Sequence, residues 1–346
     1  MSEKKNILWI NLVKGFCVLG VYYVHVVSFY GYSIPKVADY IKPFYVNAFF
    51  FISGYLLFRK QFSPYIAAKS VTEYIKTDGK IYLENLLFRL VIPSVIFSAA
   101  IYLPSYLLRN RPISAIDFFM KTVGGCTYWF TSALVVAEVL IFVLLLLRCK
   151  SFLIYLLTAS GLIILGYVLD VNQCVLIYPY SGFPWEYKQG FEAMIFLVAG
   201  GMYWKYEQKI DKYFRNKFVV LAFVLFYMIV FTIWPDRIKV LLSTSQINVV
   251  GVLMSIYASV MLILLCKLIS KAPILDYLGK NSLVFYFLSG SMPIVGSMIA
   301  GRLIPEKNFA VFMVVYLFSL LGSWVASWII NKYMSWLLDF RRIVCQ

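Results

Sequence analysis

Long runs of apolar residues alternate with short polar connectors along the whole chain. A membrane-spanning helix needs about 20 mostly apolar residues, and most of these runs reach that length. Hydrocarbon offers no water to the backbone, so such runs predict helices. The predicted spans lie near 8–28, 43–58, 86–108, 128–147, 152–169, 190–206, 217–234, 247–268, 281–300 and 308–338. We therefore predict an all-α, polytopic integral membrane protein with about ten transmembrane helices, forming a single domain over residues 1–346.

The composition excludes an ordinary water-soluble domain. Hydrophobic residues make up 62% of the chain and charged residues 14%, whereas soluble domains carry roughly a quarter charged residues. The lipid bilayer is therefore the predicted partner. The net charge of +16 would also fit a nucleic-acid binder, but the basic residues cluster in the connectors. That distribution is typical of loops beside anionic headgroups, so no nucleic-acid partner is expected.

The distribution of basic residues also predicts an orientation. Ten spans would place both termini on one side of the membrane. Lys and Arg are about twice as numerous in the termini and the connectors after even-numbered spans as in the other connectors. Both termini are therefore predicted to be cytoplasmic, although the connectors 109–127 and 235–246 are themselves basic.

Four ionisable residues fall inside the predicted spans: Lys14, His25, Arg89 and Glu138. Each costs about 2.5–3.5 kcal/mol at the centre of a bilayer unless it is paired or hydrated. Lys14 precedes His25, the only histidine of the chain, by eleven residues. On a helix this spacing places both side chains on one face, about 16 Å apart along the axis. The polar face predicts a cavity, with a snorkelling lysine and a hydrogen-bonded core imidazole as the alternatives.

The other two charges have structural alternatives as well. Arg89 lies near the predicted cytoplasmic start of its span, where its long side chain can also snorkel. Pro93 should bend that helix and free backbone carbonyls. Glu138 lies about ten residues into its span, so it should be paired or protonated. A purely structural pair and a catalytic role are equally compatible with that position.

The six cysteines are scattered without a CxxC or other metal-ligand spacing. Neither a disulfide framework nor a metal site is expected.

Five segments, in this order, carry a family resemblance: "WINLVKGFCVLGVYYVH" (9–25), "PFYVNAFFFISGYLLF" (43–58), "FRLVIP" (88–93), "YWFTSALV" (128–135) and "LGKNSLVFYFLS" (278–289). Together they resemble the membrane acyltransferase-3 family, multi-pass O-acyltransferases that modify bacterial surface glycans. Three positions depart from the family pattern. Asn11 stands where an Asp is usual, Leu86 replaces a frequent second arginine, and Ser289 stands where many members have histidine.

The resemblance implies an acyl-CoA donor used from the cytoplasm and an acyl group, often acetyl, moved to a carbohydrate hydroxyl. It implies a multi-pass protein of the bacterial cytoplasmic (inner) membrane. It also implies that His25 is the key catalytic residue.

Transfer from a thioester to an alcohol needs a base near the hydroxyl and donors near the developing oxyanion. His25 is the predicted base, because only histidine titrates near neutrality without perturbation. Direct attack by the acceptor hydroxyl is favoured over prior transfer of the acyl group to His25. Glu138 is a candidate catalytic residue that would orient His25.

Lys14 and Arg89 are the candidate residues for binding the polar part of acyl-CoA. Ser53, Tyr55 and Trp129 are candidates for lining the acceptor or the oxyanion, with helix packing as the alternative for each.

An exporter of a glycan or an organic acid is the main alternative function. Many spans, intramembrane charges and interrupted helices are typical of transporters too. A scaffold without catalysis is the third reading of the same features. Consumption of acyl-CoA with release of free thiol would separate an enzyme from both.

Overall fold

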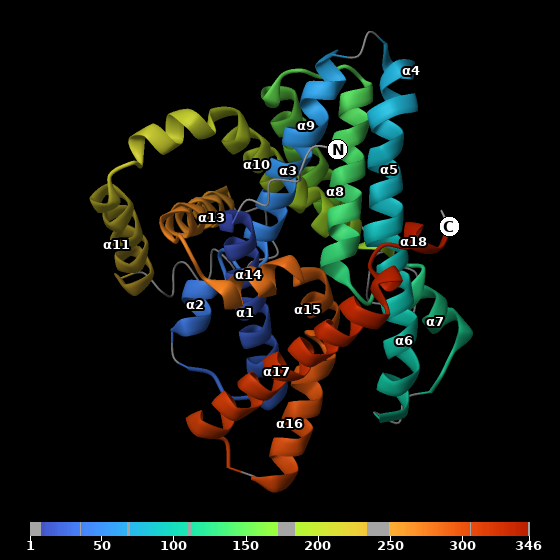
Figure 1. Ribbon diagram of the computed structural model, residues 1–346, viewed down its shortest axis with the longest axis vertical. Coiled ribbons are helices and arrows are strands. Elements are labelled where there is room, and N and C mark those ends of the chain that lie inside the picture. The colour runs from blue at the N-terminus through green and yellow to red at the C-terminus, as the bar shows by residue number, and fades with distance from the viewer. Residues whose placement is uncertain are drawn as a thin grey trace. The chain divides into compact units, whose positions relative to one another are not determined.

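The computed structural model describes residues 8–34, 36–67, 70–108, 112–171, 184–233, 249–304 and 306–344. Within these ranges every regular element is a helix and no strand occurs, which confirms the all-α class (Figure 1). The basic connector 235–246 lies outside the described residues. The described chain forms two compact units, residues 1–49 with 207–332 and residues 50–206 with 333–346.

Six helices of the described residues are long and apolar enough to cross a membrane, or eight if each of two bent pairs is one span. The six are Leu8–Tyr30, Val71–Pro104, Trp129–Leu146, Phe152–Leu169, Val249–Leu268 and Phe309–Tyr333. A multi-pass membrane protein is therefore confirmed. Ten spans and cytoplasmic termini stay predictions.

The elements of the first unit are α1 (Leu8–Tyr30), α2 (Val37–Ile41), α11 (Lys217–Ile233), α13 (Val249–Leu268), α14 (Pro273–Lys280), α15 (Ser282–Leu288), α16 (Ser291–Leu303) and α17 (Phe309–Tyr333). The predicted single helix 281–300 is wrong, because α15 and α16 are bent by 45° at the break around Gly290. α1 packs against α13, α14, α15 and α16. It is the central helix of this unit.

Close contact between α1 and α14 depends on two glycines. A Cβ on Gly15 would lie 2.4 Å from the carbonyl oxygen of Leu275, and one on Gly279 would lie 1.8 Å from that of Asn11. Both distances are shorter than any contact a Cβ makes, so only glycine permits this approach. Further along α1, the Tyr22 hydroxyl donates to the carbonyl of Phe285 in α15 at 3.0 Å. The first and the last of the five resembling segments are thus in direct contact.

The elements of the second unit are α4 (Val71–Tyr74), π-helical η1 (Ile75–Gly79), α5 (Lys80–Leu86), π-helical η2 (Leu87–Val91), α6 (Ile92–Leu108), α7 (Ala115–Thr122), α8 (Trp129–Leu146), α9 (Phe152–Val171), η3 (Pro184–Glu186), η4 (Ser335–Leu337) and α18 (Arg341–Val344). α3 (Asn47–Ala67) and α10 (Tyr187–Tyr213) each continue from one unit into the other. The predicted span 86–108 begins too late, since helical structure runs without a break from Val71.

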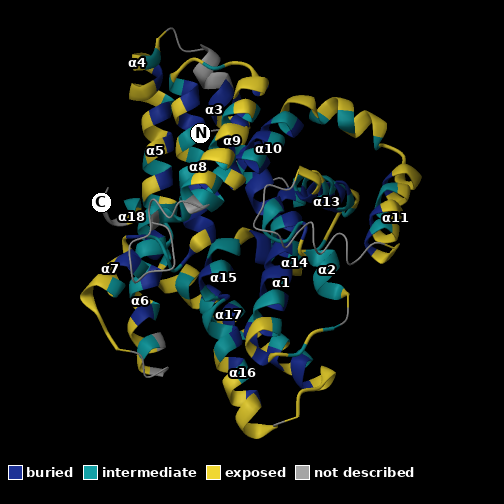
Figure 2. Cartoon of the chain, turned by 180° about the vertical axis from the view of Figure 1, so that it is seen from behind, coloured by how far each residue is buried: buried dark blue, intermediate teal, exposed yellow. Residues whose placement is uncertain are grey.

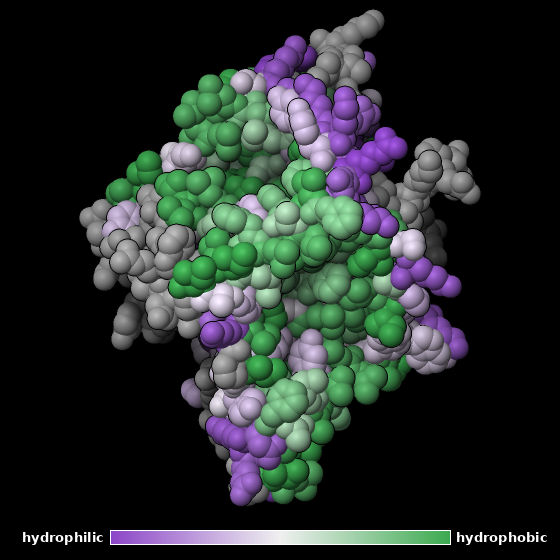
Figure 3. All heavy atoms as spheres, turned by 90° about the vertical axis from the view of Figure 1, so that its left-hand side faces the viewer, coloured by the Kyte–Doolittle hydropathy of each residue, from purple (hydrophilic) through white to green (hydrophobic). Residues whose placement is uncertain are grey.

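Burial follows the expected pattern for helices in lipid. Most residues of α8 are buried, whereas α11 exposes large apolar side chains (Figure 2). The exposed residues of α11 include Phe218, Leu221, Leu225, Phe226, Ile229 and Ile233. Figure 3 shows apolar side chains over much of the surface that it draws. An apolar exterior of this kind is stable in a bilayer rather than in water.

Candidate functional site

His25 lies in the last third of α1, which is one continuous helix from Leu8 to Tyr30. The predicted helical relation between Lys14 and His25 is therefore confirmed, and both side chains are half-buried. The imidazole stacks on the ring of Phe29, with 5.8 Å between centroids and 11° between planes. Within the part of the chain that the structure describes, no group forms a hydrogen bond with the imidazole. The alternative of a core histidine fixed by hydrogen bonds thus has no support among these residues.

Asn11, at the start of the same face, contacts a carboxylate from another element. Its side-chain amide donates to Asp276 of α14 at 2.7 Å, and Asp276 also pairs with Lys280. Burial alone would raise the pKa of Asp276, but hydrogen bonds from Lys280 and Asn11 outweigh it and lower the pKa. A carboxylate is thus present beside position 11, although residue 11 itself is not the usual acid.

Three segments predicted to lie on one side of the membrane meet in the first unit. Lys267 at the end of α13 bonds Glu207 at 2.8 Å and Asp211 at 2.7 Å, both near the end of α10. Its ammonium also lies 5.1 Å from the ring of Trp9 near the start of α1. Their proximity agrees with a common side for these three helix ends. That this side is the cytoplasm stays a prediction.

Arg89 belongs to the second unit, where it contacts the C-terminal segment. Its Nε and Nη2 atoms each lie 2.7 Å from Oδ2 of Asp339, and Arg341 binds the same carboxylate at 2.8 Å. The bond from Arg341, and the one from Arg89, hold the pKa of Asp339 well below its usual range despite some burial. Arg89 therefore has an acidic partner, and donor binding by Arg89 stays a prediction.

Pro93 explains why the C-terminal segment attaches next to Arg89. In a π-helix the carbonyl of residue i accepts from the amide of residue i+5. For Phe88 in η2 that residue is Pro93, which has no N–H. The amide of Phe340 instead donates to the Phe88 carbonyl at 3.2 Å. The predicted freeing of a backbone carbonyl by Pro93 agrees with this contact.

Glu138 lies in α8 of the second unit and accepts a hydrogen bond from the Tyr82 hydroxyl of α5 at 2.9 Å. The ring of Tyr82 stacks on Phe142, one turn after Glu138. A phenol is thus the partner that the structure gives this carboxylate. Orientation of His25 by Glu138 stays a prediction.

Ser53 and Tyr55 flank a close crossing of α3 and α10. A Cβ on Gly54 would lie 2.0 Å from the carbonyl oxygen of Leu197, and one on Gly200 would lie 1.9 Å from that of Phe51. Ser53 is half-buried. Tyr55 is 2% exposed, and its ring lies 6.3 Å from that of Tyr203. These contacts are those of helix packing, and the acceptor role of both residues stays a prediction.

Trp129 begins α8 and is 39% exposed. Its ring meets the edge of Phe130 at 6.3 Å. Its predicted role toward the acceptor is likewise untested.

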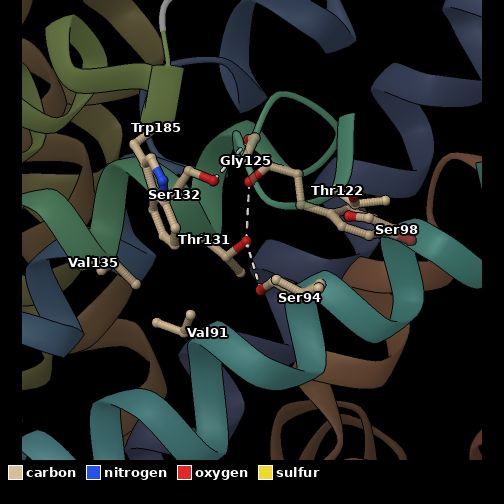
Figure 4. A pocket seen from close by; sticks show the side chains of 11 residues that line it. Val91, Ser94, Ser98, Thr122, Gly125, Thr131, Ser132, Val135 and Trp185 are labelled. Atoms are coloured by element: carbon tan, nitrogen blue, oxygen red, sulfur yellow. Dashed lines mark hydrogen bonds between the residues drawn. The ribbon is translucent and has the colours of Figure 1, made fainter. Parts of the chain in front are cut away.

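A pocket of the second unit is lined by six residues with hydroxyl groups together with apolar side chains, and we name it the hydroxyl pocket (Figure 4). Its hydroxyl-bearing residues are Ser94 and Ser98 of α6, Thr122 of α7, Tyr128, and Thr131 and Ser132 of α8. Trp185, Gly125, Val91, Val95 and Val135 complete the lining. The cavity has room for a group about the size of one water molecule.

Most of these hydroxyls bond to protein acceptors. Ser94 Oγ lies 2.7 Å from the carbonyl of Leu90 and 3.1 Å from Thr131 Oγ1. Thr131 donates to the carbonyl of Tyr128 at 2.9 Å. Ser132 donates to that of Gly125 at 2.7 Å. Each such hydroxyl keeps lone pairs that can accept from a ligand.

Backbone geometry closes the pocket around Trp185. The amide of Trp185 donates to the carbonyl of Gly124 at 2.8 Å, and Trp185 itself has a left-handed backbone with φ of 57°. Gly125 also has a positive φ of 74°, and a Cβ there would lie 2.6 Å from Ser132 Oγ. A positive φ is uncommon for a bulky residue, so the surrounding contacts must hold Trp185 in this place.

The amino-acid sequence alone did not predict this pocket, although it contains part of the signal. Ser94 and Ser98 are four residues apart, which places them on one face of a helix just after the "FRLVIP" segment. Thr131 and Ser132 lie inside "YWFTSALV". Trp185 carried no comparable signal, because it lies more than fifty residues after Ser132 in the sequence.

Comparison with known proteins identifies the family. A family model described as an acyltransferase domain matches residues 7–328, nearly the whole chain. No curated protein and no solved structure matches the chain. The matched range includes α1 with His25, the hydroxyl pocket and the contact between α1 and α14. The chain therefore belongs to the membrane acyltransferase-3 family and is a multi-pass membrane acyltransferase.

Proposed function

We propose that this protein transfers an acyl group, acetyl in the simplest case, from acyl-CoA to a hydroxyl of a cell-surface carbohydrate at the bacterial cytoplasmic membrane. The observation that carries the proposal is the half-buried imidazole of His25. No residue that the structure describes forms a hydrogen bond with it. An ionisable side chain within a span marks a functional site by default. Among the described residues, neither ring nitrogen is engaged by another group.

In the proposed step, His25 takes the proton of the acceptor hydroxyl as the oxygen attacks the thioester carbonyl. The tetrahedral intermediate then loses the CoA thiolate as the C–S bond breaks. The protonated imidazole returns its proton to the thiolate sulfur. The products are an ester on the carbohydrate and free CoA thiol, and His25 is regenerated.

Lys14 is assigned to the donor because of its place on α1. It shares the face of His25 at a distance of about 16 Å along the axis, which is about the length of an extended pantetheine arm. A phosphate group held at Lys14 would therefore let the thioester reach His25. Arg89 is the second candidate for the phosphates, and a phosphate would have to compete with the Asp339 carboxylate for the Arg89 guanidinium.

Lys14→Ala is expected to raise the half-saturating concentration of acyl-CoA about tenfold, because it removes one charge-assisted contact with the phosphates. Lys14→Arg, which keeps the charge, should retain most of the activity. Thiol release by the purified protein, measured against acyl-CoA concentration, gives both values. An unchanged half-saturating concentration in Lys14→Ala would exclude the phosphate contact.

The proposed function itself predicts a mass difference in surface glycans. Glycans from cells with the intact gene should be heavier by the mass of the added acyl groups. An acetyl group that replaces a hydroxyl hydrogen adds about 42 Da. Glycans from cells without the gene should lack them. Identical glycan masses together with altered glycan export would favour the transporter instead.

A further inference from the structure

The hydroxyl pocket contains one hydroxyl, that of Ser98, that takes no part in the contacts of the described residues. Ser98 is 3% exposed and lines the cavity. Among the described residues, none forms a hydrogen bond with it. Its Oγ is not sealed among protein atoms and faces the space of the cavity. A group inside the pocket that accepts a hydrogen bond can therefore pair with it.

The other hydroxyls of the pocket define what that group must offer. Thr131 and Ser132 donate their protons to backbone carbonyls, so only their lone pairs are available to a ligand. A matching group therefore accepts from Ser98 and donates to Thr131 or Ser132. An alcohol hydroxyl does both, whereas a phosphate or a carboxylate can only accept.

The size of the pocket and the residues of its wall further limit which ligand groups can bind. The room for one water-sized group fits a single hydroxyl or hydroxymethyl substituent, not a whole sugar ring. The indole of Trp185 lies at one side of the cavity, next to Val135 (Figure 4). An aromatic face beside hydrogen-bonding groups suits the apolar face of a sugar ring whose substituent enters the pocket.

We propose that the hydroxyl pocket binds one hydroxyl or hydroxymethyl group of the carbohydrate acceptor, with Ser98 as its donor and Trp185 as the surface for the sugar ring. This assignment rests on the proposed acyl transfer to a carbohydrate and adds the residues that select the acceptor. The assignment does not involve Trp129, which is 39% exposed and does not line the pocket.

The test uses Ser98→Ala, because this change removes only a hydroxyl that no described residue contacts through a hydrogen bond. Membranes of cells that produce the protein, which contain the natural acceptor, are incubated with radiolabelled acetyl-CoA. Label in the glycan fraction is then measured against acetyl-CoA concentration. Ser98→Ala should lower the maximal rate about tenfold and leave the half-saturating concentration of acetyl-CoA unchanged. Its melting temperature in detergent should equal or exceed that of the wild type.

Ser160→Ala is the matched control, since Ser160 is an exposed serine in α9 of the same unit. It should leave both rate and melting temperature unchanged. Ser98→Leu, which fills the cavity, should reduce the rate further than Ser98→Ala. A wild-type rate in both Ser98 variants would overturn the assignment, as would a rise in the half-saturating concentration of acetyl-CoA. A lower melting temperature in Ser98→Ala would show that the hydroxyl serves the fold.

A parallel His25→Ala sample separates the two proposals. Loss of label in His25→Ala with full label in both Ser98 variants would overturn only the pocket assignment. Equal label in wild type and His25→Ala would overturn the proposed catalytic mechanism on which the assignment rests.

Discussion

His25→Ala should reduce acyl transfer by about 10²–10⁴-fold, the range that a positioned general base contributes. His25 is the only histidine of the chain, so no second imidazole can replace it as the base. Its imidazole stacks on Phe29 and forms no hydrogen bond with the described residues, so its removal should leave helix packing largely intact. The variant should therefore insert into the membrane and melt near the wild-type temperature. Thiol release from acyl-CoA in the presence of surface glycans measures the loss.

Ser28→Ala provides the control on the same helix. Ser28 is exposed and lies three residues after His25, so its replacement should leave the rate unchanged. Ordinary turnover in His25→Ala would end the assignment of His25 as the base. The same samples distinguish direct transfer from an acyl-histidine intermediate. In the absence of acceptor, radiolabelled acetyl-CoA should leave no label on the denatured wild-type protein if transfer is direct.

The sequence predicted those features that depend on local periodicity. The face shared by Lys14 and His25 follows from 3.6 residues per turn, and α1 shows that relation because it is a continuous helix. The helical class follows from the length of the apolar runs. The effect of Pro93 was also predictable, because a missing N–H always leaves a carbonyl without its partner.

Features that depend on distant pairing were not predictable in this way. Arg89 meets Asp339 across 250 residues of sequence, and the hydroxyl pocket joins Ser98 to Trp185. Periodicity gives the face of a helix but not the residue that covers it. The π-helical segments around Tyr82 were missed for a related reason. A π-helical turn changes which backbone groups are bonded, and a sequence does not display that choice directly.

Asn11 shows how a departure from the family pattern can be compensated by packing. An acid is expected at position 11, and here Asp276 supplies a carboxylate 2.7 Å from the amide of Asn11. That contact depends on the close approach of α14 to α1, which in turn depends on Gly279. Gly279, in the last of the five resembling segments, thus determines the surroundings of Asn11, in the first of them.

Gly279→Ala should therefore destabilise the protein by about 3 kcal/mol or more, at or above the upper end for an overpacked interior. The new Cβ would lie 1.8 Å from the carbonyl oxygen of Asn11, and backbone atoms on both helices would have to move. A lower melting temperature in detergent and a lower yield of monodisperse protein measure the loss. Acyl transfer should fall as well, because α1 carries both Lys14 and His25.

Gly290→Ala is the matched control, because a Cβ at this position meets no atom within 4 Å. Gly290 lies in the same unit, eleven residues after Gly279, between α15 and α16. Since alanine restricts the unfolded chain more than glycine, Gly290→Ala should melt at or slightly above the wild-type temperature. Equal melting temperatures for the two variants would contradict the close approach of α14 to α1. A selective loss in Gly279→Ala would instead show that contact between these helices holds the polar face of α1 in place.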